Sequence, residues 1–327
     1  MNFNVPRRTN NKSRVDNIRI SLLFFVFLVT CYLSPVTVVS AEGIQSRAAV
    51  VMDAVTGRVL FAKNPDLRLM PASTTKLMTA LVVIERTNLS DIVTVSRKAS
   101  SAPATRMGLR KGDTVTIEIL LNAALIKSAN DAAVALAEAV AGSEEEFVRL
   151  MNRKAIELGL NNTSYINSNG LPGTGQYITA HDLAEIMREA FKYPLLREIL
   201  ATREAEIETD RGKIILLRNT NKLLWSDAEL LEGKTGYTRE ARHCFAGAGE
   251  REGGKIIVAL LGSPSRTVLW KETEDLMALG TRVLNNLEEP VVYLTQTDYD
   301  AAKITKASYG KKSRGKKFRK KKTRIAL

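Results

Sequence analysis

The chain of 327 residues is long enough for one large domain or two small ones, and its hydrophobic content of 45% supports a packed core. Its formal net charge is +13, of which residues 303–327 carry +12 and residues 1–41 carry +4, so that residues 42–302 carry −3. The total charge therefore does not indicate a basic binding surface on the body of the chain. With two cysteines and two histidines a structural zinc site is not expected, and we expect no metal and no cofactor.

The first 41 residues have the pattern of a secretory signal peptide. Five basic residues precede an uncharged apolar run, Ile20–Leu33, and Val39-Ser40-Ala41 supplies the small residues that a signal peptidase reads. We therefore expect cleavage after Ala41 and export. The alternative is an uncleaved membrane anchor, but these fourteen apolar residues are fewer than the about 20 that a spanning helix needs.

The cysteines and histidines offer few candidates for chemistry. Cys31 leaves with the signal peptide, so Cys244 remains alone and cannot form an intramolecular disulfide. A Ser-His-Asp arrangement would need one of the two histidines, His181 or His243, and neither has a suggestive context. His181 lies among polar residues at the start of a predicted helix, which favours a structural role.

The body of the chain begins with two short β-type runs, Ala48–Asp53 and Arg58–Ala62. Thr56-Gly57 marks a turn between them, which predicts an antiparallel hairpin. The next predicted helix, Thr74–Arg86, is apolar on nearly all sides, as is typical of a helix in the middle of a domain. Apolar residues at helical spacing predict four more helices, at 117–125, 131–140, 144–158 and 181–191.

Strand patterns return near the end of the body, at 214–217, 243–247 and 255–261, and a closing helix is predicted at 268–287. Because strands flank a helical block at both ends, this order predicts an α+β fold whose terminal strands meet in one antiparallel sheet. We expect a single catalytic domain over residues 42–290, then a short strand at 291–294.

The basic tail, residues 303–327, has too few apolar residues to form a core, so we expect it to be disordered. It is able to bind to an anionic membrane or an acidic wall polymer, with a binding free energy of about 1 kcal/mol per basic residue near a charged surface. The alternative is a solvated tail with no specific partner. We expect no nucleic acid partner, because an exported protein rarely meets its own nucleic acid.

Three short motifs carry candidates for nucleophilic catalysis. Ser73-Thr74-Thr75-Lys76 opens the apolar helix, Ser128-Ala129-Asn130 lies between two helices, and Lys234-Thr235-Gly236 lies on a β-like stretch. The Ser-x-x-Lys pattern alone has no value, since the tail contains it at 308–311 and 313–316. The three motifs together, in this order and each in a suitable context, are strong evidence for a shared site.

A serine hydroxyl is a weak nucleophile until a neighbouring base takes its proton. Lys76 lies three residues after Ser73 at the start of a helix, and so shares its face and is able to reach the hydroxyl. A lysine has an ordinary pKa of about 10.4, which burial and a second cation both lower. Lys234 can be that second cation, so the sequence indicates a serine nucleophile with a lysine base.

The remaining motif residues can serve the substrate. Ser128 can relay a proton to the leaving amine, and Asn130 can bind the substrate amide or Lys76. Lys234 and Thr235 can bind a substrate carboxylate, and Gly236 allows the strand backbone to approach a substrate closely. Taken singly, each has a plainer interpretation: Ser128 and Asn130 as helix caps, and Lys234 as an exposed strand residue.

At these residues the chain resembles the D-alanyl-D-alanine carboxypeptidase family of serine peptidases, the low-molecular-mass penicillin-binding proteins. The resemblance runs from about Arg47 to Leu287, and further stretches that match lie at 64–67, 169–171 and 218–221. It implies a β-lactamase/transpeptidase-like fold and a location in the periplasm or at the outer face of the cytoplasmic membrane. The implied partners are peptidoglycan peptides as substrates and β-lactam antibiotics as covalent inhibitors.

The resemblance also implies a role for each site residue. Ser73 forms the acyl-enzyme with Lys76 as its base, and Ser128 and Asn130 form the second catalytic element. Lys234, Thr235 and Arg218 hold the terminal carboxylate of the substrate. Gly236 belongs to the same strand, and the backbone N–H groups of Ser73 and Tyr237 form the oxyanion hole.

Two departures from the family keep its substrate open. The chain is expected to lack the β-rich second domain and the amphipathic helix of many members, and Arg242 stands where the family commonly has glycine. A DD-carboxypeptidase is the leading hypothesis, and a DD-endopeptidase that cuts cross-links is its nearest alternative. A β-lactamase would need a glutamate to activate water, which the sequence does not indicate, and a non-catalytic wall-binding protein would have lost a catalytic element.

Overall fold

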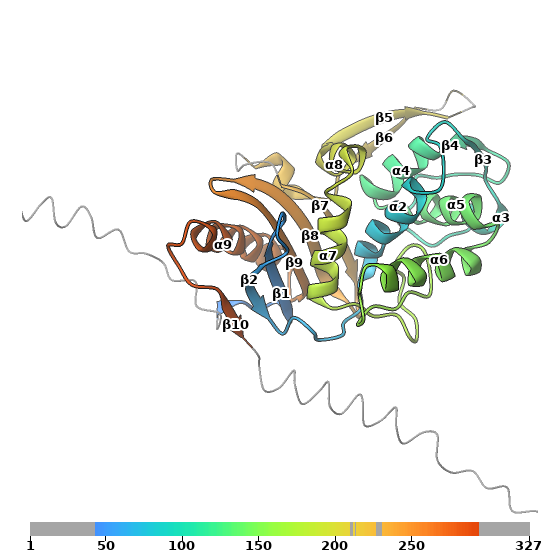
Figure 1. The fold of residues 1–327 in the computed structure, drawn as a ribbon. Helices are drawn as coiled ribbons and strands as arrows, with labels where there is room; N and C mark the ends of the chain where they lie inside the picture. Colours follow the sequence, from blue (N-terminus) through green and yellow to red (C-terminus); the bar gives the residue numbers. More distant parts are fainter. Residues whose placement is uncertain (1–42, 210–211, 213, 227–230, 294–327) are drawn as a thin grey trace, which may run out of the picture. The chain divides into compact units, whose positions relative to one another are not determined.

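The structure is a computed structural model that describes residues 43–209, 212, 214–226 and 231–293 (Figure 1). The expected signal peptide and the basic tail lie outside the described residues. The described chain contains one six-stranded sheet and two small two-stranded sheets, together with the helices that pack on them. The expected α+β fold is confirmed.

The six strands of the large sheet lie in the order β10-β2-β1-β9-β8-β7. The predicted meeting of the terminal strands is confirmed, because β1 pairs antiparallel with both β2 and β9. The strands are β1 (Ala48–Asp53), β2 (Val59–Lys63), β7 (Glu232–Thr238), β8 (Arg242–Arg251), β9 (Gly254–Ser263) and β10 (Val291–Tyr293).

One pairing differs from the expected antiparallel sheet. β10 runs parallel to β2, with Val291 opposite Phe61 and Val292 opposite Ala62. The chain reaches β10 through helix α9 (Arg266–Leu284), and such a helical crossover permits parallel pairing where a hairpin turn does not. The short strand that the sequence predicted after residue 290 is therefore β10, an edge strand of the large sheet.

The helical block packs on one face of the sheet, and α9 packs on the other (Figure 1). Its helices are η2 (Ala72–Thr75), α2 (Lys76–Ile84), α4 (Ile117–Leu125), α5 (Asn130–Ala141), α6 (Glu144–Glu157) and α7 (Ala180–Ala190). All five predicted helices of this block are present, and α4 has the predicted bounds.

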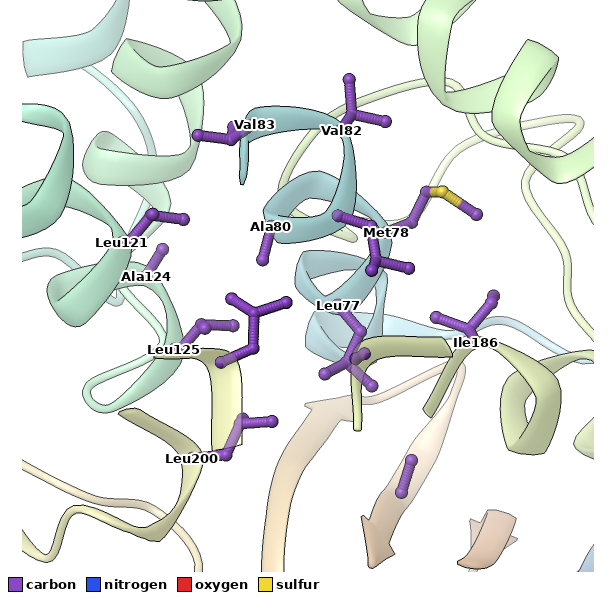
Figure 2. Close-up of a cluster of buried hydrophobic side chains, with 14 of the residues drawn as sticks. Leu77, Met78, Ala80, Val82, Val83, Leu121, Ala124, Leu125, Ile186 and Leu200 are labelled. Carbon is purple, nitrogen blue, oxygen red and sulfur yellow. The ribbon is translucent and has the colours of Figure 1, made fainter. Parts of the chain in front are cut away.

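Helix α2 is surrounded by apolar side chains, as its sequence predicted. Leu77, Ala80 and Val83 lie among Leu121, Ala124 and Leu125 of α4, Ile186 of α7 and Leu200 of α8 (Pro194–Ala201) (Figure 2). Full burial of a side chain such as leucine stabilises the folded state by about 1.5–3 kcal/mol. This packing fixes the position of the first turn of α2, which carries Lys76.

Several short elements were not predicted: five of them have only three to five residues, too few to show a period, and α8 has eight. They are α3 (Arg97–Ser100), α8, β3 (Ile92–Thr94), β4 (Thr114–Thr116), β5 (Glu204–Glu208) and η3 (Lys222–Trp225). β3 pairs with β4, and β5 pairs with β6 (Ile214–Arg218). In the described part of the chain, no helix combines the length and the apolar character needed to cross a membrane.

Candidate active site

The three motifs meet at one pocket of about 220 Å³, although they lie far apart in the sequence. Ser73 comes from η2, Ser128 from the turn before α5, and Thr235 and Gly236 from the edge strand β7. The lining residues are Ser73, Thr105, Ser128, Thr220, Thr235, Gly236, Tyr237, His243, Arg266, Leu269 and Trp270. A larger hollow of about 370 Å³ lies near β3 and contains no motif residue, so size does not select the site.

Lys76 occupies the position that a general base requires. Its side chain is fully buried, and its Nζ lies 3.1 Å from Ser73 Oγ. The same Nζ donates to Asn130 Oδ1 and to the backbone oxygen of Asn169, each at 2.7 Å. Because 3.1 Å is within hydrogen-bond reach, Lys76 is able to take the proton of the Ser73 hydroxyl.

The surroundings of Lys76 favour its neutral form. Burial holds the pKa of Lys76 well below its usual value of 10.5, the cation of Lys234 lowers it further, and the carboxylate of Asp131 opposes both. Burial also lowers the pKa of Lys234, to about 7. Between its folded-state pKa and 10.5, Lys76 is neutral in the folded chain and protonated in the unfolded chain. The burial of this lysine therefore costs stability at neutral pH, and the cost falls as the pH rises toward 10.5.

The second motif contacts both lysines. Lys234 Nζ donates to Ser128 Oγ at 2.9 Å, while Asn130 Nδ2 donates to two backbone oxygens in segment 103–104, at 3.0 and 3.1 Å. The capping interpretation is wrong, because Ala129 is the N-cap of α5 and no side chain caps this helix. Ser128 thus connects the buried Lys234 to the pocket, which Ser128 itself lines.

The third motif lies in the buried part of β7. Lys234 is fully buried, so the interpretation as an exposed strand residue is wrong. Thr235 Oγ1 lies 2.5 Å from Thr220 Oγ1. A side chain at Gly236 would meet Ala72 Cβ and Ser73 N at 3.0 Å, so glycine lets this strand approach the turn that carries the serine.

Two backbone positions beside the pocket are strained. Ala72, directly before Ser73, has φ +47°, and Ser128 has φ +64°. Such left-handed conformations cost a residue other than glycine about 1–3 kcal/mol and persist only where the surrounding structure imposes them. One strained residue directly precedes Ser73 and the other is Ser128, which indicates that the packing is arranged to present the hydroxyl groups of Ser73 and Ser128 to the pocket.

Comparison with known proteins agrees with this geometry. Residues 35–265 match the sequence pattern of peptidase family S11, D-alanyl-D-alanine carboxypeptidase. The chain belongs to the D-alanyl-D-alanine carboxypeptidase family. The resemblance inferred from the three motifs is therefore confirmed.

The relatives and structural neighbours of this chain are named for three different activities. The D-alanyl-D-alanine carboxypeptidase DacF of Bacillus subtilis is 38% identical over 224 residues, which is 67% of this chain and 58% of that protein. The D-alanyl-D-alanine endopeptidase of Pseudomonas aeruginosa is 35% identical over 208 residues, 62% of this chain and 67% of that protein. The crystal structure of the Streptomyces K15 DD-transpeptidase superposes with a TM-score of 0.68 at 32% identity, over 72% of this chain and 97% of that one.

Five predicted site residues line the pocket of this D-alanyl-D-alanine carboxypeptidase family member, and Lys76, Lys234 and Asn130 are connected to them by hydrogen bonds. Arg218 does neither. Side chains alternate along β6, so Arg218 shares the exposed face of the strand with Ile214 and Leu216. Its side chain is 70% exposed, is paired with Glu204 and does not line the pocket. Two residues later, Thr220 occupies the place beside Thr235.

Beside the predicted Tyr237, the pocket wall contains His243 and Arg266, which the sequence did not suggest. Tyr237 is 59% exposed, and its ring lies 4.5 Å from the ring of His243, centroid to centroid. Burial lowers the pKa of His243, and the nearby cation of Arg266 lowers it further. Arg266 was missed because the closing helix was predicted to begin at 268, whereas it begins at Arg266 and brings its first turn to the pocket.

Proposed function

We propose that this chain is a serine-type D-alanyl-D-alanine carboxypeptidase that acts on peptidoglycan stem peptides through an acyl-enzyme at Ser73. The observation that supports it most directly is the contact of a fully buried Lys76 with Ser73 Oγ at 3.1 Å. A lysine whose pKa lies well below 10.5 can act as a base at neutral pH without a histidine.

The reaction begins when Lys76 takes the proton of Ser73 and Oγ attacks the carbonyl carbon of the penultimate D-alanine. The backbone N–H groups of Ser73 and Tyr237 stabilise the oxyanion, as preorganised donors do in acyl transfer. Ser128, in contact with Lys234, gives its hydroxyl proton to the departing amine of the terminal D-alanine as the C–N bond breaks, and it regains a proton from Lys76, which is then neutral again. Water then attacks the ester and releases the shortened peptide, which regenerates Ser73.

The substrate peptide lies beside β7 and extends the sheet. β7 is an edge strand of the large sheet, and its residues Thr235, Gly236 and Tyr237 line the pocket. Backbone hydrogen bonds from an added strand hold a peptide with little regard to its side chains. Lys234 and Thr235 bind the terminal carboxylate, for which a buried cation and a hydroxyl are suitable partners.

A DD-endopeptidase is the second candidate, because the Pseudomonas endopeptidase is similar to this chain over 67% of its own length. Cross-link cleavage uses the same residues with a larger leaving group. A β-lactamase is less well supported. Among the residues that line the described pocket there is no aspartate or glutamate that is able to activate water. We therefore expect penicillin to remain on Ser73 as a long-lived acyl-enzyme.

Digestion of purified peptidoglycan fragments distinguishes these candidates. Protein lacking residues 1–41 is expected to remove the terminal D-alanine from uncross-linked pentapeptides, with products identified by mass spectrometry. Conversion of cross-linked dimers to monomers, with pentapeptides left intact, would establish the endopeptidase in its place. No change in either substrate would overturn both.

We also propose that residues 1–41 direct export, that residues 42–290 contain the catalytic machinery, and that the basic tail holds the protein at the cell envelope. The apolar run of the first segment and the twelve basic residues of 303–327 support this. Protein purified from the envelope is expected to begin at residue 42 when its N-terminus is sequenced. A chain ending at residue 302 is expected to leave the membrane fraction at lower salt than the full chain, and equal release of the two would exclude the tail as the anchor.

A further inference from the structure

The Nζ of Lys76 has a third partner that the proposed reaction does not use. It donates to the backbone oxygen of Asn169 at 2.7 Å, as closely as to Asn130 Oδ1. A carbonyl oxygen on a loop directs the lysine only if the loop itself is held in place. The structure shows how residues 167–170 are held.

Ser168, directly before this carbonyl group, is held at three atoms. Its backbone N and its Oγ both donate to Glu144 Oε1, at 3.0 and 2.7 Å, and its backbone oxygen accepts from Thr79 Oγ1 at 2.6 Å. Ser168 is fully buried and Glu144 nearly so. Thr79 lies one turn after Lys76 on α2, so the helix that carries the lysine also fixes the loop that the lysine contacts.

Glu144 is itself fixed in place. It is the first residue of α6, where the helix dipole favours a carboxylate, and its second oxygen lies 3.2 Å from Lys98 Nζ. On the other side of the carbonyl group, Gly170 N donates to Asn167 Oδ1 at 2.7 Å. The Asn169 carbonyl group therefore stands between Ser168, which cannot shift without breaking buried hydrogen bonds, and Gly170, whose hydrogen bond is partly buried.

We propose that Ser168 and Glu144 are positioning residues for the general base. They hold the Asn169 carbonyl group where it directs Lys76 Nζ at Ser73 Oγ. This inference rests on the proposed function, because it assigns a role in the activation of Ser73. Neither residue is among those that line the described pocket, and both act through the backbone oxygen of Asn169.

The proposal predicts a direction for the pH dependence. The groups that face Lys76 Nζ are Lys234 on β7, Asp131 and Asn130 on α5, Ser73 on η2 and the Asn169 oxygen. An accepting oxygen stabilises an ammonium group more than an amine, because the hydrogen bond is then charge-assisted. Loss of the carbonyl contact therefore lowers the pKa of Lys76 further, so the acid limb of the acylation rate moves to lower pH. The plateau rate falls as well, because the amine is no longer aimed at the hydroxyl.

The test measures the second-order rate constant of penicillin acylation against pH for the wild type and Ser168→Ala. The variant is expected to show a plateau about tenfold lower and an acid limb displaced to lower pH. Ser46→Ala is a matched control: Ser46 is also fully buried, and its N and Oγ also donate to one buried glutamate, Glu272. A loss of stability alone would lower the active fraction of both variants and leave the acid limb unmoved.

Glu144 supplies a second, independent pair of variants. Glu144→Gln keeps an accepting oxygen for Ser168 and is expected to retain the wild-type acid limb, whereas Glu144→Leu removes it and is expected to reproduce Ser168→Ala. If Ser168→Ala does not fold, this pair provides the same measurement. An unchanged plateau and limb in Ser168→Ala and Glu144→Leu would overturn the positioning role. Absence of acylation at Ser73 in the wild type would instead overturn the proposed function.

Discussion

Replacing Ser73 with alanine is expected to abolish covalent labelling by penicillin and to lower stem-peptide hydrolysis by about four orders of magnitude or more. The acyl-enzyme needs an oxygen at this position, and the neighbouring hydroxyl of Ser128 cannot take its place. Ser128 Oγ is bound to Lys234 Nζ, whereas Lys76 Nζ contacts Ser73. The measurement is the intact mass of the protein after incubation with penicillin.

The fold is expected to survive this change. Within the described part of the chain, the Ser73 side chain has one hydrogen-bond partner, Lys76 Nζ, and removing its oxygen leaves no cavity larger than a hydroxyl group. Ser101→Ala, at an exposed serine outside the pocket, is the matched control and should label like the wild type. A penicillin adduct on the Ser73→Ala protein would show that another residue is the nucleophile.

Replacing Gly170 with alanine is expected to lower both stability and acylation strongly. Gly170 has φ +88°, and a Cβ there would lie 1.8 Å from the backbone oxygen of Ala72, directly before Ser73. The overlap is with backbone and not with the end of a flexible side chain, so the turn that carries the nucleophile must move. We expect a loss of about 3–5 kcal/mol in the free energy of unfolding, from left-handed strain and overpacking together.

Gly112→Ala separates these two contributions. Gly112 has φ +84°, close to that of Gly170, but nothing lies within 4 Å of its Cβ position. This control is expected to lose only about 1–2 kcal/mol from left-handed strain and to keep its acylation rate. Chemical denaturation and penicillin acylation measure both quantities. Equal losses in the two variants would mean that the contact with Ala72 is unimportant.

The long elements of the fold could be predicted because their patterns repeat several times. Helix Ile117–Leu125 and strand Ala48–Asp53 were predicted with their observed bounds. The strand Glu204–Glu208 was missed because three of its five residues are glutamates. Only Ala205 and Ile207 supply apolar side chains, which is too few to show a strand pattern. The parallel pairing of β10 with β2 was missed because the pattern of a short segment does not indicate which distant strand it will pair with.

Some site residues could likewise be predicted from the sequence, and others could not. Ser73 in η2 and Lys76 at the start of α2 are three residues apart in consecutive helical turns, so their contact follows from helical geometry. Arg218 was predicted to bind the substrate because it lies in a stretch that resembles the family. Side chains alternate between the two faces of β6, however, and Arg218 lies on the exposed face. Thr220 lies in the segment between β6 and η3, and it stands beside Thr235 of β7 because of tertiary packing, which no residue near Thr220 indicates.

The sequence by itself determined the chemistry: a serine, two lysines and a Ser-x-Asn turn in an order that identifies the family. Only the tertiary structure decided the state of those groups. Burial lowers the pKa of Lys76 and of Lys234. The burial of each lysine depends on all the elements that pack around it, and these are distant in the sequence. The Asn169 oxygen that contacts Lys76 belongs to the backbone, which every residue shares. The position of this oxygen depends on how Ser168, Glu144 and Gly170 hold the loop. The side chain of Asn169 therefore does not predict the contact with Lys76.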